Sequence, residues 1–455
     1  MQQVNGIAEL LRLRPSGMAP EIIIYCEQDS PRLQAACHFI FETALQCRFK
    51  VLCTPAPQSS LQPALVYASQ YTGALLQIVP QGLLNQKGTA SLVPDSALLG
   101  ELPVFFPQNS ELGFDLFSAV FYFISRYEEY QDYQRDEHER FERKASVLFQ
   151  NGWHLQPLLE TWCQVAARLL ENKWPDFKLP GRQFQVISSI DVDNLFAYRH
   201  KGFIRSAGAA LRDVLKGDWT SFRTRLKVLS GKEKDPFDVY GELGDFCFEN
   251  KIALFCFFLM RSGTKYDRSV HPSSPAFKAV VKTLTDNYVQ CGLHPSYDSK
   301  NDATVLKREM EALRQAGVSP IISSRQHFLR FDIRRTPALL QSEGIAYDFT
   351  MGFATGAGFR AGTSLPFHWY NFEEEKNENL VFVPFCAMDG VWSVYGNADT
   401  ATALRELEAL AEDIRRQKGI FMSVFHERSF SDHLYPGFGT LYKKLHSGLS
   451  AFSQH

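Results

Sequence analysis

The stretch VISSIDVDNLFAYRH, residues 186–200, decides the fold, because an apolar run ends there in two aspartates one residue apart. Such a run predicts a buried strand. Residues i and i+2 of a strand share a face, so Asp191 and Asp193 should point the same way. Neighbouring carboxylates repel each other unless a cation or a shared proton relieves them. The pair therefore indicates a metal site, acid–base chemistry, or a solvated strand end where the repulsion costs little.

Around this stretch, short apolar runs alternate with segments of helical period. After QVISSIDVD come IALFCFFLM, NYVQCGLHPSY, GVSPIISSRQHFLRF, IAYDFTMGF, LVFVPFCAMD and GIFMSVFHE. Alternating strands and helices imply parallel strands joined by crossover helices. About seven strands predict an α/β fold for residues 186–455, a TIM-barrel-like (β/α) domain that is either complete or irregular.

The N-terminal part of the chain forms a second unit. EIIIYCE, SPRLQAACHFIFETALQ and FKVLCTP predict strand, helix and strand, and so a separate αβ domain over residues 1–180 whose role the sequence does not indicate. The prolines and glycine of KWPDFKLPGR, residues 173–182, mark the boundary. The charged segment RYEEYQDYQRDEHERF, residues 126–141, is expected to be a solvated helix face or a domain-contact surface.

The composition excludes several classes of protein. The 48 basic and 50 acidic residues provide no overall field for nucleic acid or an anionic membrane. No apolar run is long enough for a membrane span and no signal peptide is recognisable, which predicts a cytoplasmic protein. Nine scattered cysteines without a C-x-x-C pair argue against disulfides and against a thiolate zinc site. The sequence does not indicate the oligomeric state.

Polar residues that end the apolar runs are the functional candidates, because function in such folds gathers at the carboxyl ends of the strands. Each alone could be structural, as a turn cap, a core histidine or half of an ion pair. Acids, histidines and an arginine nevertheless recur at five strand ends, which favours a single site. The candidates are Asp191, Asp193, His294, Asp298, Arg325, His327, Asp348 and His426.

These strand ends resemble the motifs of the NodB-homology polysaccharide deacetylases, a carbohydrate esterase family of metal-dependent hydrolases that remove N-acetyl and sometimes O-acetyl groups from glycans. SIDVDN, HPSYD, RQHF, YDFTMGF and VFH occur in the family's order over roughly residues 186–430. Residues 1–180 resemble an uncharacterised domain found ahead of such deacetylase domains in bacteria. The resemblance implies a bacterial hydrolase that removes an acyl group, most of all N-acetyl, from a glycan or glycan precursor.

The resemblance also implies a divalent metal ion held by Asp193 and His294. Asp298 stands where the family has a second histidine. An Asp-His-Asp set would shift the preference from zinc toward manganese, iron or magnesium. His327 stands where the family usually has proline, so it would either supply the missing imidazole or bind substrate.

Catalytic roles follow from the same resemblance. Asp191 would act as the base that deprotonates a water, and Arg325 would orient this base and keep it ionised. His426 would be the acid that protonates the departing amine or alkoxide, and Asp348 would hold its ring.

A Gly-rich and then aromatic stretch, GAGFRAGTSLPFHWYNF, is a further candidate for substrate binding. Arg360, His368 and Trp369 could contact a carbohydrate, or a lipid- or nucleotide-linked glycan, although glycines and aromatic residues in a loop also serve as turns and core.

Three other interpretations remain open. In a glycosyltransferase, the DVD triplet would hold a metal ion and a nucleotide sugar, but His294 and His426 would then have no role. A non-catalytic glycan-binding protein that has lost one metal ligand is the second alternative. A phosphotransferase of the HAD type is weaker, because Asn194 and Leu195 stand where its phosphate-contacting residues would follow the D-x-D.

Overall fold

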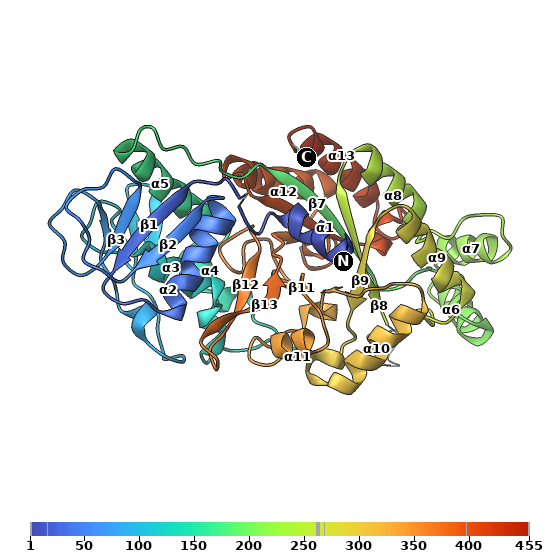
Figure 1. The fold of residues 1–455 in the computed structure, drawn as a ribbon. Helices are drawn as coiled ribbons and strands as arrows, with labels where there is room; N and C mark the ends of the chain where they lie inside the picture. Colours follow the sequence, from blue (N-terminus) through green and yellow to red (C-terminus); the bar gives the residue numbers. More distant parts are fainter. Residues whose placement is uncertain (1, 16, 261–263, 268, 397, 454–455) are drawn as a thin grey trace.

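The computed structural model describes residues 2–15, 17–260, 264–267, 269–396 and 398–453. Over these residues the chain forms a mixed α/β structure with two main sheets (Figure 1). The larger sheet is built from strands that begin at residue 185, and the smaller one belongs to the N-terminal part of the chain. The predicted α/β class is therefore confirmed.

The larger sheet has nine strands, which are parallel except for one edge strand, β12, that pairs antiparallel with β13. Within the described residues no pairing joins the two edges, so the sheet curls into a half-barrel and does not close. The barrel prediction is thus confirmed only in part. In spatial order the strands are β12 (Phe367–Asn371), β13 (Lys376–Phe382), β11 (Tyr347–Asp348), β10 (Ser323–Ser324), β9 (Gln290–His294), β8 (Ala253–Leu259), β7 (Gln185–Val192), β15 (Ile420–His426) and β14 (Ala387–Met388).

The central strands β7 and β15 are buried along their whole length, so the polar side chains that β7 carries, among them Ser188, Ser189 and Asp191, are buried as well. Their register places Asp191 of β7 directly opposite His426 of β15. On the other side of β7, Asp191 is opposite Phe257 of β8. Because parallel strands end at the same edge, the polar residues after several strands meet there.

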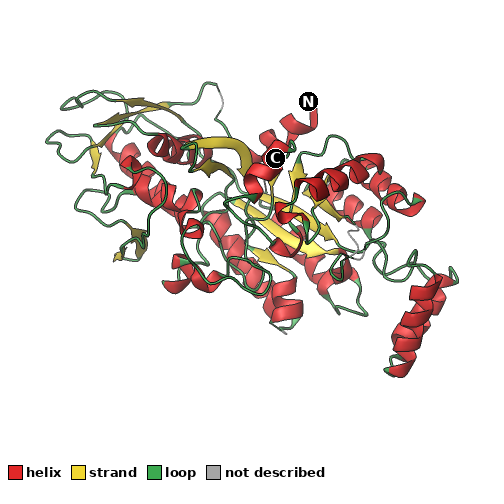
Figure 2. Ribbon diagram, turned by 90° about the horizontal axis from the view of Figure 1, so that it is seen from below, coloured by secondary structure: helices red, strands yellow, loops and turns green. Residues whose placement is uncertain are grey.

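Helices follow most of the parallel strands and cover the sheet (Figures 1 and 2). Several begin at caps that the sequence predicts. The Ser274 hydroxyl accepts a hydrogen bond from the Phe277 N–H with Pro275 in the first turn, and Asp302 and Asp399 cap two later helices. The helices are α8 (Tyr240–Glu249), α9 (Pro275–Asp286), α10 (Ala303–Gln315), α11 (Thr336–Ser342), α12 (Thr400–Arg416) and α13 (Phe438–Ser450).

The N-terminal part contains a parallel sheet of four strands in the order β2-β1-β3-β4 and a short antiparallel hairpin. Helix α1 (Gln2–Leu11) lies apart from this sheet, near the amino end of β7 (Figure 1). The strands are β1 (Glu21–Cys26), β2 (Arg48–Leu52), β3 (Ala64–Tyr67), β4 (Leu76–Ile78) and the hairpin β5 (Ser96–Leu99) and β6 (Leu102–Phe105); the main helices are α2 (Pro31–Cys37), α3 (Leu116–Ile124), α4 (Val147–Gln150) and α5 (Leu158–Lys173).

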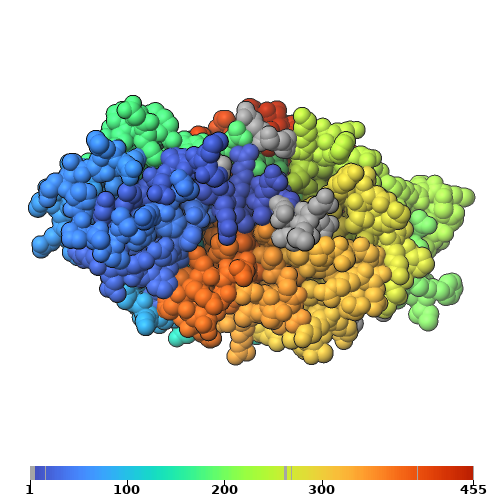
Figure 3. Space-filling model, in the orientation of Figure 1, coloured from blue at the N-terminus to red at the C-terminus, as the bar shows by residue number. Residues whose placement is uncertain are grey.

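The two parts of the chain share one continuous hydrophobic core and pack directly against each other (Figure 3). Buried polar contacts also join them. The Arg360 guanidinium lies 2.6 Å from the Glu129 carboxylate, and the Ser364 hydroxyl donates to Glu160 at 2.6 Å. The two-domain division at about residue 180 remains a prediction, because the packing does not by itself separate the parts.

A helical hairpin is inserted between β7 and α8 and projects from the body (Figure 2). It consists of α6 (Phe203–Leu215) and α7 (Trp219–Leu229). Among the described residues, no helix has the length and apolar character that crossing a membrane requires.

Candidate metal centre

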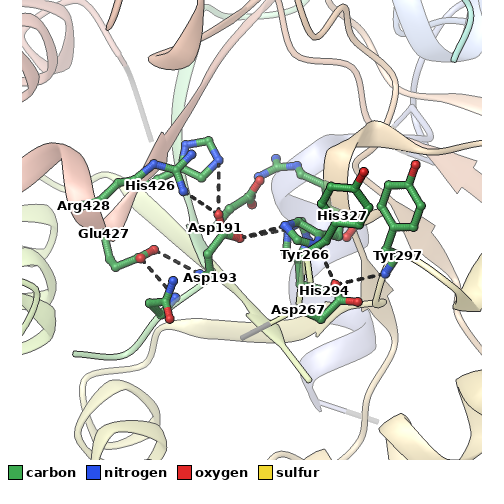
Figure 4. Close-up of polar contacts among 12 residues, drawn as sticks. Asp191, Asp193, Tyr266, Asp267, His294, Tyr297, His327, His426, Glu427 and Arg428 are labelled. Carbon is green, nitrogen blue, oxygen red and sulfur yellow. Dashed lines mark hydrogen bonds and ion pairs between the residues drawn. The ribbon is translucent and has the colours of Figure 1, made fainter. Parts of the chain in front are cut away.

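The strand ends of the large sheet surround a cleft of about 240 Å³. Its walls include both aspartates of the DVD stretch and three histidines that come from separate elements (Figure 4). His294 ends β9, His426 ends β15, and His327 lies in a short turn after β10. The predicted convergence of strand-end residues therefore occurs for most of the candidates.

Asp193, His294 and His327 form a buried group that could hold a metal ion. The Asp193 Oδ1 atom lies 3.5 Å from His294 Nε2 and 3.6 Å from His327 Nε2. Within the described part of the chain, this oxygen is buried and has no hydrogen-bond partner. A buried carboxylate oxygen is costly unless it is paired. One carboxylate and two imidazoles are a common ligand set for a divalent transition metal.

Hydrogen bonds at the far side of each imidazole fix its orientation. The Nδ1 atom of His294 lies 2.5 Å from the Arg325 carbonyl oxygen, and Nδ1 of His327 lies 2.8 Å from Asp267 Oδ1. An oxygen acceptor at Nδ1 selects the tautomer with its proton there, which leaves the Nε2 lone pair facing Asp193. This arrangement is typical of histidines that bind metals.

The charges around Asp193 also suit a cation. Burial alone would raise the pKa of Asp193, but the imidazoles of His327 and His294 and the Arg428 guanidinium hold it well below its ordinary value. Arg428 Nη1 lies 2.6 Å from Asp193 Oδ2, the oxygen that does not face the two imidazoles. Asp193 is therefore a carboxylate, with one oxygen neutralised by arginine and the other available to a metal.

Two further contacts hold the strand end in place. The Glu427 carboxylate accepts hydrogen bonds from the backbone N–H groups of Asp193 and Asn194, both at 3.0 Å. Phe328 and Leu329, just after His327, have positive φ angles of 59° and 53°. Non-glycine residues adopt such angles at a cost that packing must offset, so the turn that carries His327 is specified by its surroundings.

Asp191 lies beside Arg325 on one side of the group. Arg325 is fully buried, and its Nη1 donates to Asp191 Oδ1 at 2.7 Å while Nη2 donates to the Ser189 hydroxyl at 2.8 Å. The guanidinium also packs 4.6 Å from the centre of the Phe257 ring. Arg325 thus lies in contact with Asp191, and its role in orienting that carboxylate remains a prediction.

His426 lies on the opposite side of Asp193, and its partner is Asp389. Nδ1 of His426 is 2.7 Å from Asp389 Oδ1, and its Nε2 is 3.9 Å from Asp193 Oδ2. Burial and Arg428 oppose protonation of this ring, but the carboxylates of Asp389 and Asp193 raise the pKa of His426 above its ordinary value. The protonated ring can therefore present an Nε2–H to the cleft.

Two predicted residues do not take the places expected for them. Asp298 is exposed, because the chain after His294 turns away from the strand and does not continue as a helix that would put residues four apart on one face. Asp348 accepts hydrogen bonds from the Ser324 and Thr350 hydroxyls at 2.9 and 3.0 Å and does not contact His426. The residue that lies beside Asp193 and His294 is His327, and the carboxylate that contacts His426 is Asp389.

The three residues predicted for substrate binding from the Gly-rich stretch lie elsewhere. Arg360 is fully buried in its ion pair with Glu129. His368 Nδ1 lies 2.8 Å from the Glu378 carbonyl oxygen, within the β12–β13 pair, and Trp369 is a buried side chain of the same strand. None of the three side chains lines the cleft around Asp193, so a role for them in substrate binding there remains a prediction without a contact to support it.

Asp267, Asp389 and Arg428 are site residues that the sequence interpretation missed. Asp389 was open to prediction, because it is the polar residue that ends the apolar run LVFVPFCAMD. Asp267 lies in a loop well beyond the end of β8, and Arg428 lies in the turn after β15, so no periodic pattern points to either.

Aromatic side chains form one wall beside the metal ligands. The Tyr266 and Tyr297 rings stack with centroids 4.3 Å apart, and Phe328 packs against both. Arg140, from the N-terminal part, also lines the cleft and donates to the Phe328 carbonyl oxygen at 3.2 Å. The charged segment 126–141 therefore contributes to the contact between the two parts of the chain, which is one of the two roles predicted for it.

Comparison with known proteins finds one similarity in the N-terminal part and one in a solved structure. Residues 22–175 match the model of DUF7033, a family of unknown function. No curated protein matches the chain by sequence. A similar solved structure is that of a proposed polysaccharide deacetylase from Mycobacterium smegmatis, with 17% identity and a TM-score of 0.37 over 60% of this chain and 87% of that chain. A likeness of this size is distant.

Proposed function

We propose that the protein is a metal-dependent hydrolase that removes an acyl group, N-acetyl above all, from a glycan or a glycan precursor. The observation that carries the proposal is the order of groups across the cleft. The Asp193, His294 and His327 ligand set lies between the Asp191–Arg325 pair on one side and the His426–Asp389 pair on the other. A hydrolase needs this combination of a cation site, a base and an acid.

Asp193, His294 and His327 would hold the metal ion through Oδ1 and the two Nε2 atoms. When bound, a divalent ion polarises a substrate carbonyl and lowers the pKa of a nearby water. Two imidazoles and one carboxylate contain more nitrogen than the set expected from the sequence, which moves the preference back toward zinc while leaving iron and manganese as alternatives.

Asp191 is the group placed to accept the proton of the attacking water. It precedes Asp193 by two residues at the same strand end and faces Arg325, whose Nη1–H occupies one carboxylate oxygen. Arg325 cannot itself take part in proton transfer, because a guanidinium stays protonated. It therefore acts as a positioning residue that fixes the direction of the base.

His426 is the group placed to protonate the leaving amine or alkoxide. Its raised pKa favours the imidazolium, and Asp389 directs the remaining Nε2–H into the cleft. Amines are poor leaving groups unless they are protonated. A histidine acid is thus consistent with amide hydrolysis.

The aromatic wall of Tyr266, Tyr297 and Phe328 suits the apolar face of a sugar ring or the methyl group of an acetyl. A glycosyltransferase would also use an aspartate pair with a metal, but it would leave the oriented imidazoles of His294 and His327 without a role. The hydrolase proposal gives these two imidazoles a role as metal ligands. Turnover of a substrate distinguishes such a hydrolase from a non-catalytic glycan-binding protein.

The test is acetate release from a panel of N-acetyl sugars and an activated aryl acetate, with the metal content of the purified protein measured in parallel. His426→Ala should slow the amide substrates by about 10²–10⁴ and the aryl acetate far less, because its leaving group needs little protonation. Asp191→Asn should slow both substrates alike. Equal losses with His426→Ala on the two substrates, or no turnover by the metal-loaded wild type on any of them, would contradict the proposal.

A further inference from the structure

The α6–α7 hairpin exposes a series of large apolar side chains to solvent. Phe203 and Ile204, at the start of α6, are 88% and 86% exposed, and Leu215, at its end, is 78% exposed. Trp219, the first residue of α7, is 54% exposed and lies across the turn from Leu215. Contiguous exposed apolar residues mark an interaction site more often than they occur by chance on a surface.

The spacing of these residues makes them one stripe of α6. Phe203, Leu211 and Leu215 are separated by multiples of four residues, and Ile204 lies next to the first of them. Residues at these spacings share a face of a helix. Arg205 and Arg212, the two basic residues of α6, lie off this stripe. The helix is therefore amphipathic, with its apolar face turned away from the protein body.

The hairpin is also strongly basic, in contrast to the chain as a whole. Residues 199–235 contain ten Lys or Arg and four Asp or Glu, an excess of six positive charges in a chain of net charge −2. All four acidic residues have partners within this segment or its approach from β7. Asp213 pairs with Arg225, Glu233 pairs with Lys227, Asp218 caps α7, and Asp235 accepts backbone N–H groups at residues 197–199.

Specific contacts hold the two helices together and fix the hairpin to the body. Within the hairpin, the buried Arg225 of α7 donates to Asp213 of α6 at 2.8 and 3.0 Å; outside it, the guanidinium lies 4.7 Å from the centre of the Tyr198 ring. The Ser221 hydroxyl lies 2.6 Å from His433 Nε2, in the segment after β15. The apolar stripe is therefore presented in a fixed direction.

The hairpin begins at the edge of the sheet that carries the candidate metal centre. It follows β7 after a loop of about ten residues, and the Lys201 ammonium donates to the Asn194 side-chain oxygen at 2.9 Å. Asn194 itself lines the cleft. A surface bound by the hairpin would therefore lie on the same edge of the molecule as the cleft.

We propose that this hairpin binds the surface of an anionic lipid bilayer. The stripe of Phe203, Ile204, Leu211 and Leu215 would enter the boundary between headgroups and acyl chains, and the surrounding Lys and Arg side chains would contact lipid phosphates. The positive charge of the hairpin, together with its apolar stripe, favours a lipid surface over the other possible binding partners. A second copy would bring two hairpins of like charge together, and a nucleic acid would match the basic residues but leave the aliphatic stripe uncovered.

The proposal goes beyond the proposed hydrolase, and its test does not use activity. The full-length protein is sedimented with vesicles of phosphatidylcholine alone and of phosphatidylcholine mixed with phosphatidylglycerol. We expect binding to the anionic vesicles, weaker binding in high salt, and little binding to the neutral ones. The double variant Phe203→Ser/Ile204→Ser should weaken binding about tenfold or more, since both side chains contribute apolar area to the lipid interface. Arg205→Glu/Lys216→Glu should weaken it at least as much.

Matched controls lie outside the hairpin. Phe248→Ser/Tyr288→Ser removes two apolar rings that are 75% and 85% exposed, and Lys251→Glu/Lys278→Glu reverses two exposed charges. Both control variants should bind like the wild type. No wild-type binding to anionic vesicles, or equal losses in hairpin and control variants, would overturn the proposal. So would a wild-type dimer that Phe203→Ser/Ile204→Ser dissociates in the absence of vesicle binding.

Discussion

The imidazole of His327 donates its Nδ1–H to Asp267 Oδ1 across 2.8 Å, although 60 residues of chain separate them. The ring is thereby held with Nε2 toward Asp193. Asp267 also accepts the backbone N–H of Tyr297 at 3.1 Å, so its own position is tied to the segment after His294. One carboxylate outside the ligand set thus links the loops that follow three strands.

Removing this carboxylate's charge should weaken metal binding without removing a ligand. We expect Asp267→Asn to lower metal affinity about 10–100-fold, because His327 loses the acceptor that fixes its tautomer and raises its basicity. Competition with a chelator of known affinity measures the change. Asp302→Asn, which alters only an exposed helix cap, is the control and should retain wild-type affinity.

The ligand set itself makes a second prediction. Asp193→Ala, His294→Ala and His327→Ala should each purify without stoichiometric metal while retaining the circular dichroism of the folded protein. Asp298→Ala should keep its metal, because this side chain is exposed and outside the group. Elemental analysis of the four purified variants measures how much metal each one retains. If Asp298→Ala lost as much metal as His327→Ala, the ligand assignment would be wrong.

The pair of His426 and Asp389 predicts the high-pH limit of activity. A general acid must be protonated, so the rate should fall as pH rises through the raised pKa of His426. Asp389→Asn removes the carboxylate that favours the imidazolium and should move this limb of the pH–rate profile to lower pH. Asp348→Asn should leave the limb where it is, because Asp348 bonds Ser324 and Thr350 instead. If Asp348→Asn moved this limb and Asp389→Asn did not, Asp348 would be the carboxylate that supports His426.

Glu160, at the contact with Ser364, predicts a pH-dependent stability. Burial raises its pKa from 4.5 to about 7, so the folded state binds this proton more tightly than the unfolded state does. The resulting stability is fully present below pH 4.5 and is lost as pH rises to about 7. The difference corresponds to roughly 3 kcal/mol.

Urea unfolding at several pH values, with wild type and Glu160→Gln compared at each, isolates this contribution. The variant cannot ionise there, so its stability relative to the wild type should rise between these two pH values and then stay constant. Glu408→Gln, at an exposed position on α12, should show no such trend. A constant difference between wild type and Glu160→Gln across the range would rule out the effect.

The sequence could predict much of the site because strand ends are visible in it. Asp191, Asp193, His294 and His426 all follow apolar runs, and parallel strands bring such ends to one edge. The alternation of strands and helices likewise indicated the α/β class. The open half-barrel could not be predicted, because closure depends on pairing between edges that no local pattern encodes.

The remaining site residues depend on loop conformation. Asp298 is expected as a ligand because it stands four residues after His294, in the place of the family's second histidine, but the chain there forms a turn and the side chain is exposed. His327 is followed by two consecutive residues of positive φ, which shape the turn that places it beside Asp193. Non-glycine residues rarely adopt such angles, so the sequence does not indicate this turn. Asp267 comes from a loop whose path is set by tertiary contacts.

The buried pair of Glu129 and Arg360 limits how such a chain can change in evolution or be rebuilt by exchange of its parts. One member lies in the part that matches DUF7033, and the other lies 231 residues later, beside the large sheet. A recombination that joined this N-terminal part to an unrelated sheet would leave Glu129 with Arg126 alone, 2.8 Å away, and would remove the charge that Arg360 supplies. A recombination that kept the large sheet but replaced the N-terminal part would leave the buried Arg360 without its carboxylate, and an unpaired buried charge costs about 3–5 kcal/mol. The two parts are therefore best inherited, exchanged and engineered together.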